Sequence, residues 1–372
     1  MFDTIIRNVR IIEDELWKFV DLGIINERFA EISPSITGSA RNEVDGDCAY
    51  CLPGSVDLHV HFNEPGRAHW EGFTTGSAAA SAAGITYLAE MPLNSVPSTT
   101  NVDALKTKLS AINNKSYLDF GLWGGVVPGN VNDLEPLAKA GVIGFKAFMA
   151  PSGNDDFENS DNSTLREAMF RIAQTGRRLA LHAEDKVVLN RALKRLKRTV
   201  SAFDWDASRP VEAEISATKT AIELSVETGC PITIVHVSSV EVLNLIQNAK
   251  RQGVDITCET CPHYLLLSRV DADTIGADAK CAPPLRSKAR MRAMEEAVFD
   301  NLIDTIGSDH SPSPPEMKKD KPFFDAWGGI AGIQHGYPLL LSRYGMDILP
   351  RIKLIQRLCC ENPAKIIKLK SK

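Results

Sequence analysis

The pattern of apolar and polar positions changes near residue 53. Before it, apolar and polar side chains alternate in short runs, as in residues 4–9, 18–25 and 28–32, with polar turns between them. Alternation with a period of two is typical of strands that bury one face. We therefore predict that residues 1–52 form a small, sandwich-like β-sheet domain of antiparallel strands.

From residue 53 onward, short apolar runs alternate with amphipathic segments. Parallel strands joined by right-handed helical crossovers give this pattern, and eight such units close a (β/α)8 barrel. We therefore expect an α/β fold with a TIM barrel over residues 53–372, whose chemistry lies at the carboxyl ends of the strands. The predicted strands are 55–61, 85–91, 117–126, 142–149, 178–183, 231–237, 255–260 and 304–308, and the predicted helices are 72–83, 102–112, 163–175, 213–228, 240–252 and 290–301.

Composition limits the kinds of partner that we expect. The formal net charge is -5 at pH 7 and the pI is near 6.0, so no excess of basic residues is available for nucleic acid. No stretch of about 18 apolar residues occurs, and the first residues lack the basic region and long apolar core of a signal peptide. We therefore expect a cytoplasmic protein that acts on a small molecule and binds neither nucleic acid nor a membrane.

The eight cysteines include two CxxC pairs, Cys48/Cys51 and Cys258/Cys261, which are too far apart in sequence for a zinc ribbon. Residues 258–261 also fall in a strand-like run, where alternate side chains point to opposite faces. We expect reduced, structural cysteines, as in the cytosol.

Side chains that bind metal ions follow several of the strand-like runs. Two histidines stand at positions i and i+2 at the end of the first barrel run, a spacing that points both rings to one face of a strand. A lone histidine is more often a hydrogen-bonded core or surface residue. Because six suitable residues occur at corresponding strand ends, the pattern predicts a metallohydrolase. The candidates are His59, His61, Lys146, His182, His236 and Asp309.

Lys146 is the one charged residue in the apolar run 144–149. A buried, unpaired ammonium is costly, so we expect the amine to become neutral or to find a partner. A neutral amine can react with carbon dioxide to form a carbamate, an oxygen ligand that can bridge two cations. The alternative is a lysine paired with a buried carboxylate.

The HxH pair, the lysine of the fourth strand, the two later histidines and the final aspartate resemble the amidohydrolase superfamily. Within it, they resemble the cyclic-amide hydrolases, which include dihydroorotases, hydantoinases and allantoinases. The resemblance implies two divalent ions, one held by His59, His61 and Asp309 and the other by His182 and His236. Carbamylated Lys146, an N6-carboxylysine, would bridge the ions.

The same resemblance implies that a hydroxide bridging the two ions is the nucleophile. Asp309 would accept its proton and pass it to the leaving nitrogen as general base and then general acid. Zinc suits this mixed set of nitrogen and oxygen ligands, and so do manganese, cobalt and iron.

Other stretches bear on which ring is opened. Dihydroorotases carry an arginine where this chain has Asn63, which removes the fork for a substrate carboxylate. The segments 63–72, 91–95, 258–264, 280–286, 308–318 and 326–332 are similar to those of the allantoinase branch, which implies hydrolysis of allantoin to allantoate in purine and ureide catabolism. Hydantoinase, dihydropyrimidinase and dihydroorotase activities are the alternatives.

Four residues are candidate substrate contacts. Asn94 and Ser311 follow predicted strands, with Asn63 and His263 behind them. The alternative roles are fixing loops for Asn94 and Ser311 and supporting a metal ligand for His263.

Relatives in this superfamily usually continue past the barrel, and the extension completes the small sheet. This chain stops at Lys372, so we expect an incomplete sheet with exposed edges and apolar surface. A second interpretation is therefore a truncated, non-catalytic scaffold that acts through oligomerisation. The resemblance itself implies a homotetramer.

Overall fold

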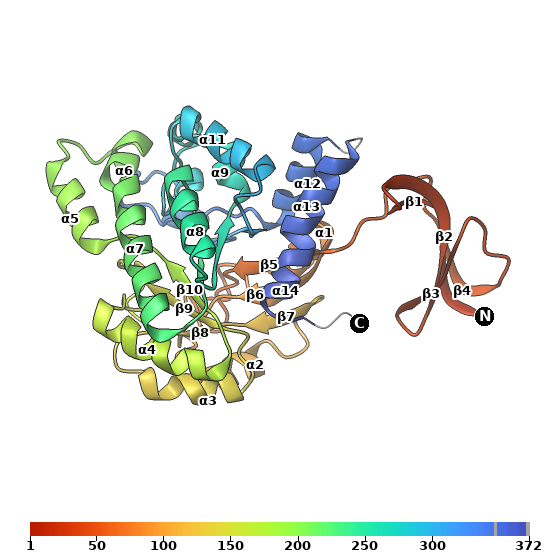
Figure 1. The fold of residues 1–372 in the computed structure, drawn as a ribbon, viewed down its shortest axis with the longest axis horizontal. Coiled ribbons are helices and arrows are strands. Elements are labelled where there is room, and N and C mark those ends of the chain that lie inside the picture. Colours follow the sequence, from red (N-terminus) through yellow and green to blue (C-terminus); the bar gives the residue numbers. More distant parts are fainter. Residues whose placement is uncertain (346–347, 370–372) are drawn as a thin grey trace.

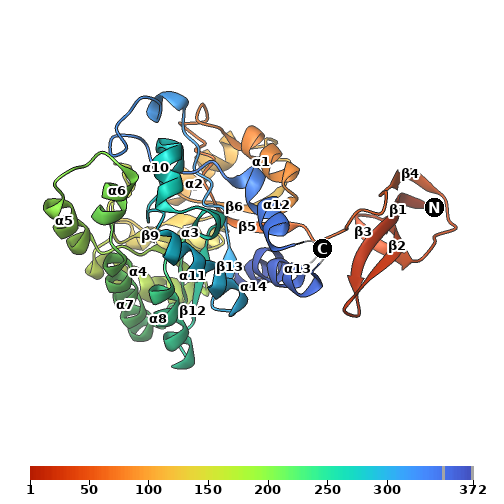
Figure 2. The same cartoon turned by 90° about the horizontal axis from the view of Figure 1, so that it is seen from above.

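The computed structural model describes residues 1–345 and 348–369. Its N-terminal part is a four-stranded sheet in the order β3-β2-β1-β4. Its small apolar core is Ile5, Val9, Val20 and Leu22. Figures 1 and 2 show this sheet beside the main body of the protein. The strands are β1 (Phe2–Glu13), β2 (Leu16–Ile25), β3 (Arg28–Ser33) and β4 (Ala40–Asp45).

The three predicted runs form antiparallel strands as expected, but the sequence analysis missed the fourth strand, β4. Strands β1, β2 and β3 pair in antiparallel fashion, but β4 pairs with β1 in parallel. Strand β4 is polar and almost entirely exposed, so it lacks the alternation that marks a half-buried strand. Its pairing is instead supported by Arg7 of β1, which binds both Glu43 on β4 and Asp21 on β2.

The remaining strands are parallel and together form a barrel. Strands β7 and β8 are two pieces of one predicted strand, separated only by Trp123, so the barrel has the eight strand positions that the sequence predicts. The strands are β5 (Ser55–Val60), β6 (Ile85–Glu90), β7 (Asp119–Leu122), β8 (Gly124–Gly125), β9 (Phe145–Phe148), β10 (Leu179–His182), β11 (Ile232–Ile234), β12 (Ile256–Thr260) and β13 (Thr305–Ile306).

The barrel closes between its first and last strands. Val60 at the end of β5 forms a parallel bridge with His310, which follows β13. Asp57 on β5 accepts hydrogen bonds from the backbone N–H of Ser308 at 3.1 and 3.2 Å. These contacts bring residues around position 60 against residues around position 309.

Helices surround the barrel (Figure 1). The six predicted helices coincide with α1, α2, α4, α7, α8 and α11, with bounds that differ by at most two residues. The helices are α1 (Phe73–Ala82), α2 (Val102–Ala111), α3 (Leu134–Lys139), α4 (Asn162–Thr175), α5 (Lys186–Arg195), α6 (Ala202–Ser208), α7 (Val211–Thr228), α8 (Val240–Arg251), α9 (Pro262–Leu266), α10 (Arg269–Ile275), α11 (Lys288–Phe299), α12 (Ile333–Tyr344), α13 (Leu349–Gln356) and α14 (Asn362–Ile366).

Helix α4 shows how the sequence sets such an element. Asp161 caps its first turn by accepting the N–H of Thr164, and Gly176 ends it in the left-handed conformation with φ of 67°. Its buried side chains recur at the spacing of one helical face and pack on the barrel. They are Leu165, Ala168, Met169 and Ile172.

None of the helices that the structure describes has the length and apolar character needed to cross a membrane.

Candidate metal centre

The predicted metal ligands meet at the carboxyl ends of the barrel strands. His59 and His61 lie in and just after β5, and Asp309 follows β13. The Nε2 atoms of His59 and His61 lie 3.2 and 3.4 Å from Oδ1 of Asp309. One ligand atom from each of these three residues lies within 4.8 Å of the others, so a single cation can contact all three.

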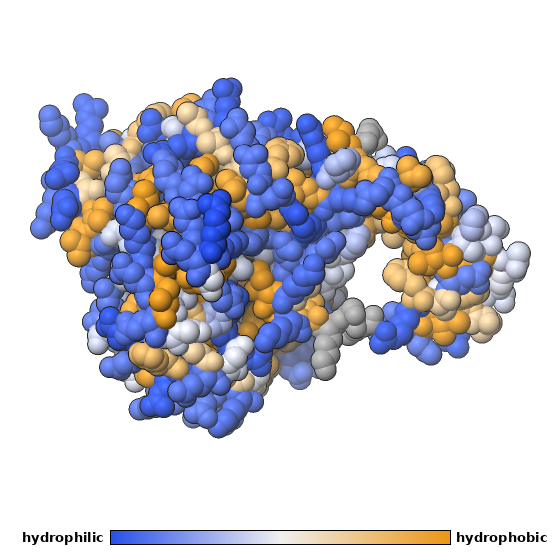
Figure 3. Space-filling view, in the orientation of Figure 1, coloured by the Kyte–Doolittle hydropathy of each residue, from blue (hydrophilic) through white to orange (hydrophobic). Residues whose placement is uncertain are grey.

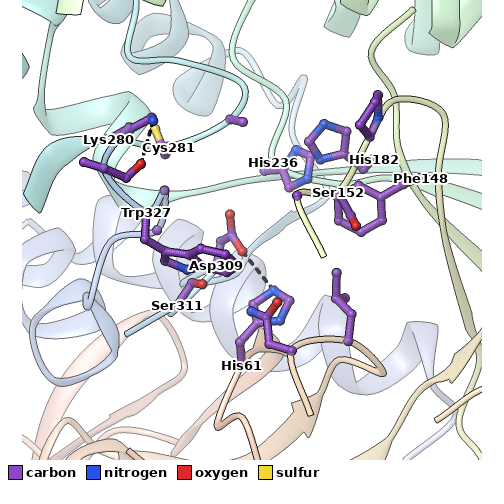
Figure 4. Close-up of a pocket in the computed structure, with 18 of the residues that line it drawn as sticks. His61, Phe148, Ser152, His182, His236, Lys280, Cys281, Asp309, Ser311 and Trp327 are labelled. Atoms are coloured by element: carbon purple, nitrogen blue, oxygen red, sulfur yellow. Dashed lines mark hydrogen bonds and ion pairs between the residues drawn. The ribbon is translucent and has the colours of Figure 1, made fainter. Parts of the chain in front are cut away.

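The other three candidates lie on neighbouring strands. The rings of His182 at the end of β10 and His236 after β11 are 4.6 Å apart, and His236 is 5.5 Å from the ring of His59. Lys146 lies on β9 and is paired in register with Ala180 of β10. Figure 4 shows Asp309 between His61 and the pair formed by His182 and His236.

Two of these residues have strained backbones. His236 has a φ of 42° and Asp309 a φ of 46°. Left-handed conformations are uncommon for residues other than glycine, and they are found at functional sites more often than elsewhere. Both side chains line the cavity at the point where a strand ends.

Burial sets the protonation of the four imidazoles. Loss of hydration lowers the pKa of His59 and of His61 to about 4. It also lowers the pKa of His182, and it lowers that of His236 to well below the ordinary value. Neutral imidazoles with free lone pairs are the form that binds a metal ion.

Lys146 is fully buried, and its Nζ has no hydrogen-bond partner within the part of the chain that the structure describes. Burial lowers its pKa to about 8, although Asp309 and Glu259 act in the opposite direction. The alternative of a lysine hydrogen-bonded to a buried carboxylate is therefore not what the structure shows. Its Nζ lies 5.1 Å from the centroid of the Phe148 ring.

Asp309 is the anionic member of the cluster. Burial alone would raise its pKa, but His59 and a hydrogen bond from His61 hold it well below the ordinary value. The carboxylate is therefore ionised at neutral pH. It can bind a cation or accept a proton.

Two buried glutamates that the sequence analysis missed contact the histidines. Oε1 of Glu259 on β12 lies 2.7 Å from Nδ1 of His59, and Oε2 of Glu184 lies 2.7 Å from Nε2 of His182. Burial raises the pKa of Glu259 to about 8. Burial opposes ionisation of Glu184 as well, but Arg209 and His182 outweigh it and lower its pKa to about 2.

A cavity of about 330 Å³ opens beside the ligands. Asn94 and Ser311 line it, whereas Asn63 and His263 are buried outside its lining. The amide of Asn63 donates to the backbone oxygen of Pro312 at 3.3 Å. The cavity is also lined by Trp205 and Arg209, which the sequence analysis did not single out, and by Lys280, Cys281 and Trp327 from the segments 280–286 and 326–332. Figure 4 shows Trp327 beside Ser311 and Asp309.

The sequence of residues 50–372 matches the model of the Amidohydrolase family. The chain belongs to the amidohydrolase family. Members of this family are hydrolytic enzymes, so the cluster of His59, His61 and Asp309 is the candidate metal site of an enzyme.

This amidohydrolase has curated relatives that span most of its length. It is 44% identical to an allantoinase of Rubrobacter xylanophilus over 345 aligned residues. The alignment covers 92% of this chain and 75% of the relative. It is 41% identical to an allantoinase of Bacillus velezensis over 375 aligned residues. This alignment covers 100% of this chain and 82% of the relative.

The fold of this amidohydrolase is also that of solved structures. It aligns with the L-hydantoinase (dihydropyrimidinase) of Arthrobacter aurescens with a TM-score of 0.92 and 32% sequence identity, over 99% of this chain and 83% of the other. A dihydropyrimidinase of Brevibacillus agri aligns with a TM-score of 0.86 and 26% identity, over 98% and 81% of the two chains.

Proposed function

We propose that this enzyme hydrolyses the ring of allantoin to give allantoate in purine and ureide catabolism. The observation that carries the proposal is the 41–44% identity to allantoinases over nearly the whole chain. The amide of Asn94 and the hydroxyl of Ser311 on the cavity wall could donate hydrogen bonds to a ureido-bearing ring and accept them from it.

We propose that these donor atoms serve two divalent ions. His59, His61 and Asp309 would hold one ion, and His182 and His236 the other. Lys146 would be carbamylated by carbon dioxide and would reach both, which accounts for a buried amine without a hydrogen-bond partner among the described residues. Zinc is the metal we propose, and manganese, cobalt and iron suit the same ligands.

Divalent ions bound here would lower the pKa of a water molecule and polarise the amide carbonyl of the ring. The side chain of Asp309 would accept the proton of that water, because it is the carboxylate of the cluster and is ionised at neutral pH. It would then return the proton to the ring nitrogen that leaves the carbonyl carbon. The nitrogen stays attached to the product through the rest of the opened ring.

We propose that Asn94 and Ser311 orient the substrate, with Asn63 and His263 supporting them from outside the cavity lining. We also propose that the enzyme is a cytoplasmic homotetramer. All eight cysteines are free, which fits a reducing compartment.

The test is a comparison of purified enzyme on allantoin, hydantoin, dihydrouracil and dihydroorotate. We expect kcat/KM to be highest for allantoin, and we expect His59→Asn to lose at least about 100-fold in kcat through loss of a ligand. His69→Asn is the matched control, because His69 is exposed and outside the cavity lining.

A preference for hydantoin or dihydrouracil would replace the proposed substrate with the one named by the structural relatives. No turnover of any ring, together with fewer than one bound metal ion per chain, would favour the non-catalytic scaffold instead.

A further inference from the structure

The buried pair Glu184–Arg209 lies directly behind His182. Glu184 has no exposed side-chain surface, and that of Arg209 is 15% exposed. Oε2 of Glu184 is 2.7 Å from Nε2 of His182. On its other side, Glu184 accepts from Nε of Arg209 at 3.0 Å and also from Nη2. The carboxylate therefore joins a predicted metal ligand to a guanidinium.

The hydrogen bond decides which nitrogen of His182 is available. A carboxylate that binds a guanidinium through both oxygens is ionised and can only accept hydrogen bonds. Nε2 of His182 must then carry the hydrogen, which leaves the lone pair on Nδ1. His59 shows the opposite arrangement, because Glu259 contacts its Nδ1 and its Nε2 faces Asp309.

The ring of His182 is fixed in a second direction. It stacks on the ring of Phe148 with centroids 4.5 Å apart and planes inclined by 16°. Stacking fixes the plane of the imidazole, and the bond to Glu184 fixes its rotation within that plane. Together they leave one orientation for Nδ1.

Arg209 is itself held in place. Its guanidinium lies 5.2 Å from the centre of the Trp205 ring, and its backbone oxygen accepts from Arg286 at 2.5 Å. Arg286 is buried and binds Asp206 at 2.8 Å and Glu214 at 2.6 Å. The position of Glu184 is thus set by a network anchored on α6 and α7.

We propose that Glu184 and Arg209 are positioning residues that orient His182 so that its Nδ1 binds a metal ion. This inference rests on the proposed metal-dependent function. Neither residue takes part in proton transfer. Their effect falls on the ion that His182 holds, because among the described residues neither Glu184 nor Arg209 forms a hydrogen bond or ion pair with His59, His61 or Asp309.

The alternative is an ion pair that only stabilises the fold. Glu90 and Lys108 provide a matched case, because their side chains form a buried ion pair at the end of another barrel strand, with 0% and 1% exposure. Neither lines the cavity. Glu90→Gln therefore removes a comparable buried carboxylate without touching a histidine of the metal centre.

The experiment titrates chelator-treated protein with cobalt(II) and follows its visible absorption, without substrate. We expect the wild type to bind two ions per chain. In Glu184→Gln, one ion should bind about 10- to 100-fold more weakly with a changed spectrum, while the other keeps its affinity. Arg209→Met should act in the same direction, and Arg209→Lys should recover part of the affinity because it keeps a cation beside Glu184.

Thermal unfolding separates the two roles. If Glu184→Gln and Glu90→Gln lower Tm alike and leave the affinity of both ions unchanged, the pair is merely structural and the proposal is overturned. A wild type that binds fewer than two ions also overturns it. A wild type that binds two ions but leaves allantoin intact would remove the proposed substrate and not this inference.

Discussion

Buried imidazole rings make the stability of the metal-free protein depend strongly on pH. The pKa of His59 and of His61 is about 4 in the folded chain because burial disfavours the charged ring. In the unfolded chain each imidazole titrates near its ordinary value of about 6.5. Between these values the unfolded chain binds protons that the folded chain does not, so acid favours unfolding.

We therefore expect the free energy of unfolding of the metal-free protein to fall as the pH is lowered from 6.5 towards 4. At pH 5 the loss should be about 2 kcal/mol for each of these two rings. Urea unfolding of chelator-treated protein at pH 7.5 and pH 5 measures it. His61→Asn should shrink the difference, and the exposed His69→Asn should leave it unchanged; equal differences in all three proteins would refute the explanation.

Among single residues, the candidate metal ligands could be predicted from the sequence, but the glutamates that contact them could not. Histidine pairs and a lysine in an apolar strand are rare, so His59, His61 and Lys146 were noticeable. Glu184 was not, because glutamate is common near strand ends and only the fold places it behind His182. Glu259 gave a weaker signal than Lys146, since it is the one charged residue of β12 but two of the other four residues of that strand are threonines.

Individual elements are joined by buried ion pairs as well as by apolar contacts. Lys108 on α2 pairs with Glu90 at the end of β6, and both are almost fully buried. Burial raises the pKa of Glu90 to about 7, with Lys108 acting in the opposite direction. The pair therefore holds α2 against the strand that leads into the loop carrying Asn94.

Replacing one partner of this pair should lower the free energy of unfolding more than replacing both. We expect Lys108→Met to lower the free energy of unfolding by about 3 kcal/mol, because it leaves the buried carboxyl without its cation. The double variant Glu90→Leu/Lys108→Met should recover most of that loss. A double-mutant cycle in urea measures the coupling, and additive losses would show that the two side chains do not stabilise each other.

The elements that could be predicted are those with a strong hydrophobic period. The barrel strands and the longer helices bury one face or both, so their apolar residues recur at a regular spacing in the sequence. Strand β4 lacks such a spacing, because it is held by backbone pairing and by Arg7 rather than by an apolar face. Short helices such as α6 and α10 were missed because seven residues cover only about two helical turns, too few to establish a period.

At the scale of the molecule, the small sheet and the barrel differ in how much they bury. Strands β3 and β4 are almost entirely exposed, whereas β9 and β10 are fully buried. Phe19 and Phe29 of the sheet are 58% and 63% exposed, and Figure 3 shows apolar surface there. We propose that residues 1–52 are a domain distinct from the barrel domain 53–372, of which residues 346–347 and 370–372 lie outside the described part.

Hydrogen exchange tests this division. We expect the backbone amides of β3 and β4 to exchange faster than those of β9 and β10 by roughly tenfold or more, because few buried contacts oppose local opening. Repeating the measurement at several protein concentrations tests the proposed tetramer, since association that covers the sheet would slow its exchange. Uniform protection at every concentration would contradict the division into two domains.

The contact that closes the barrel also has a consequence for how the enzyme is made. Asp57 and Ser308 meet across the seam although they are 251 positions apart in sequence. The cluster of His59, His61 and Asp309 therefore cannot exist on the ribosome until the last barrel strand has emerged. An ion that contacts all three residues can therefore be bound only after β13 and Asp309 have emerged, and a nascent chain stalled earlier would lack the carboxylate.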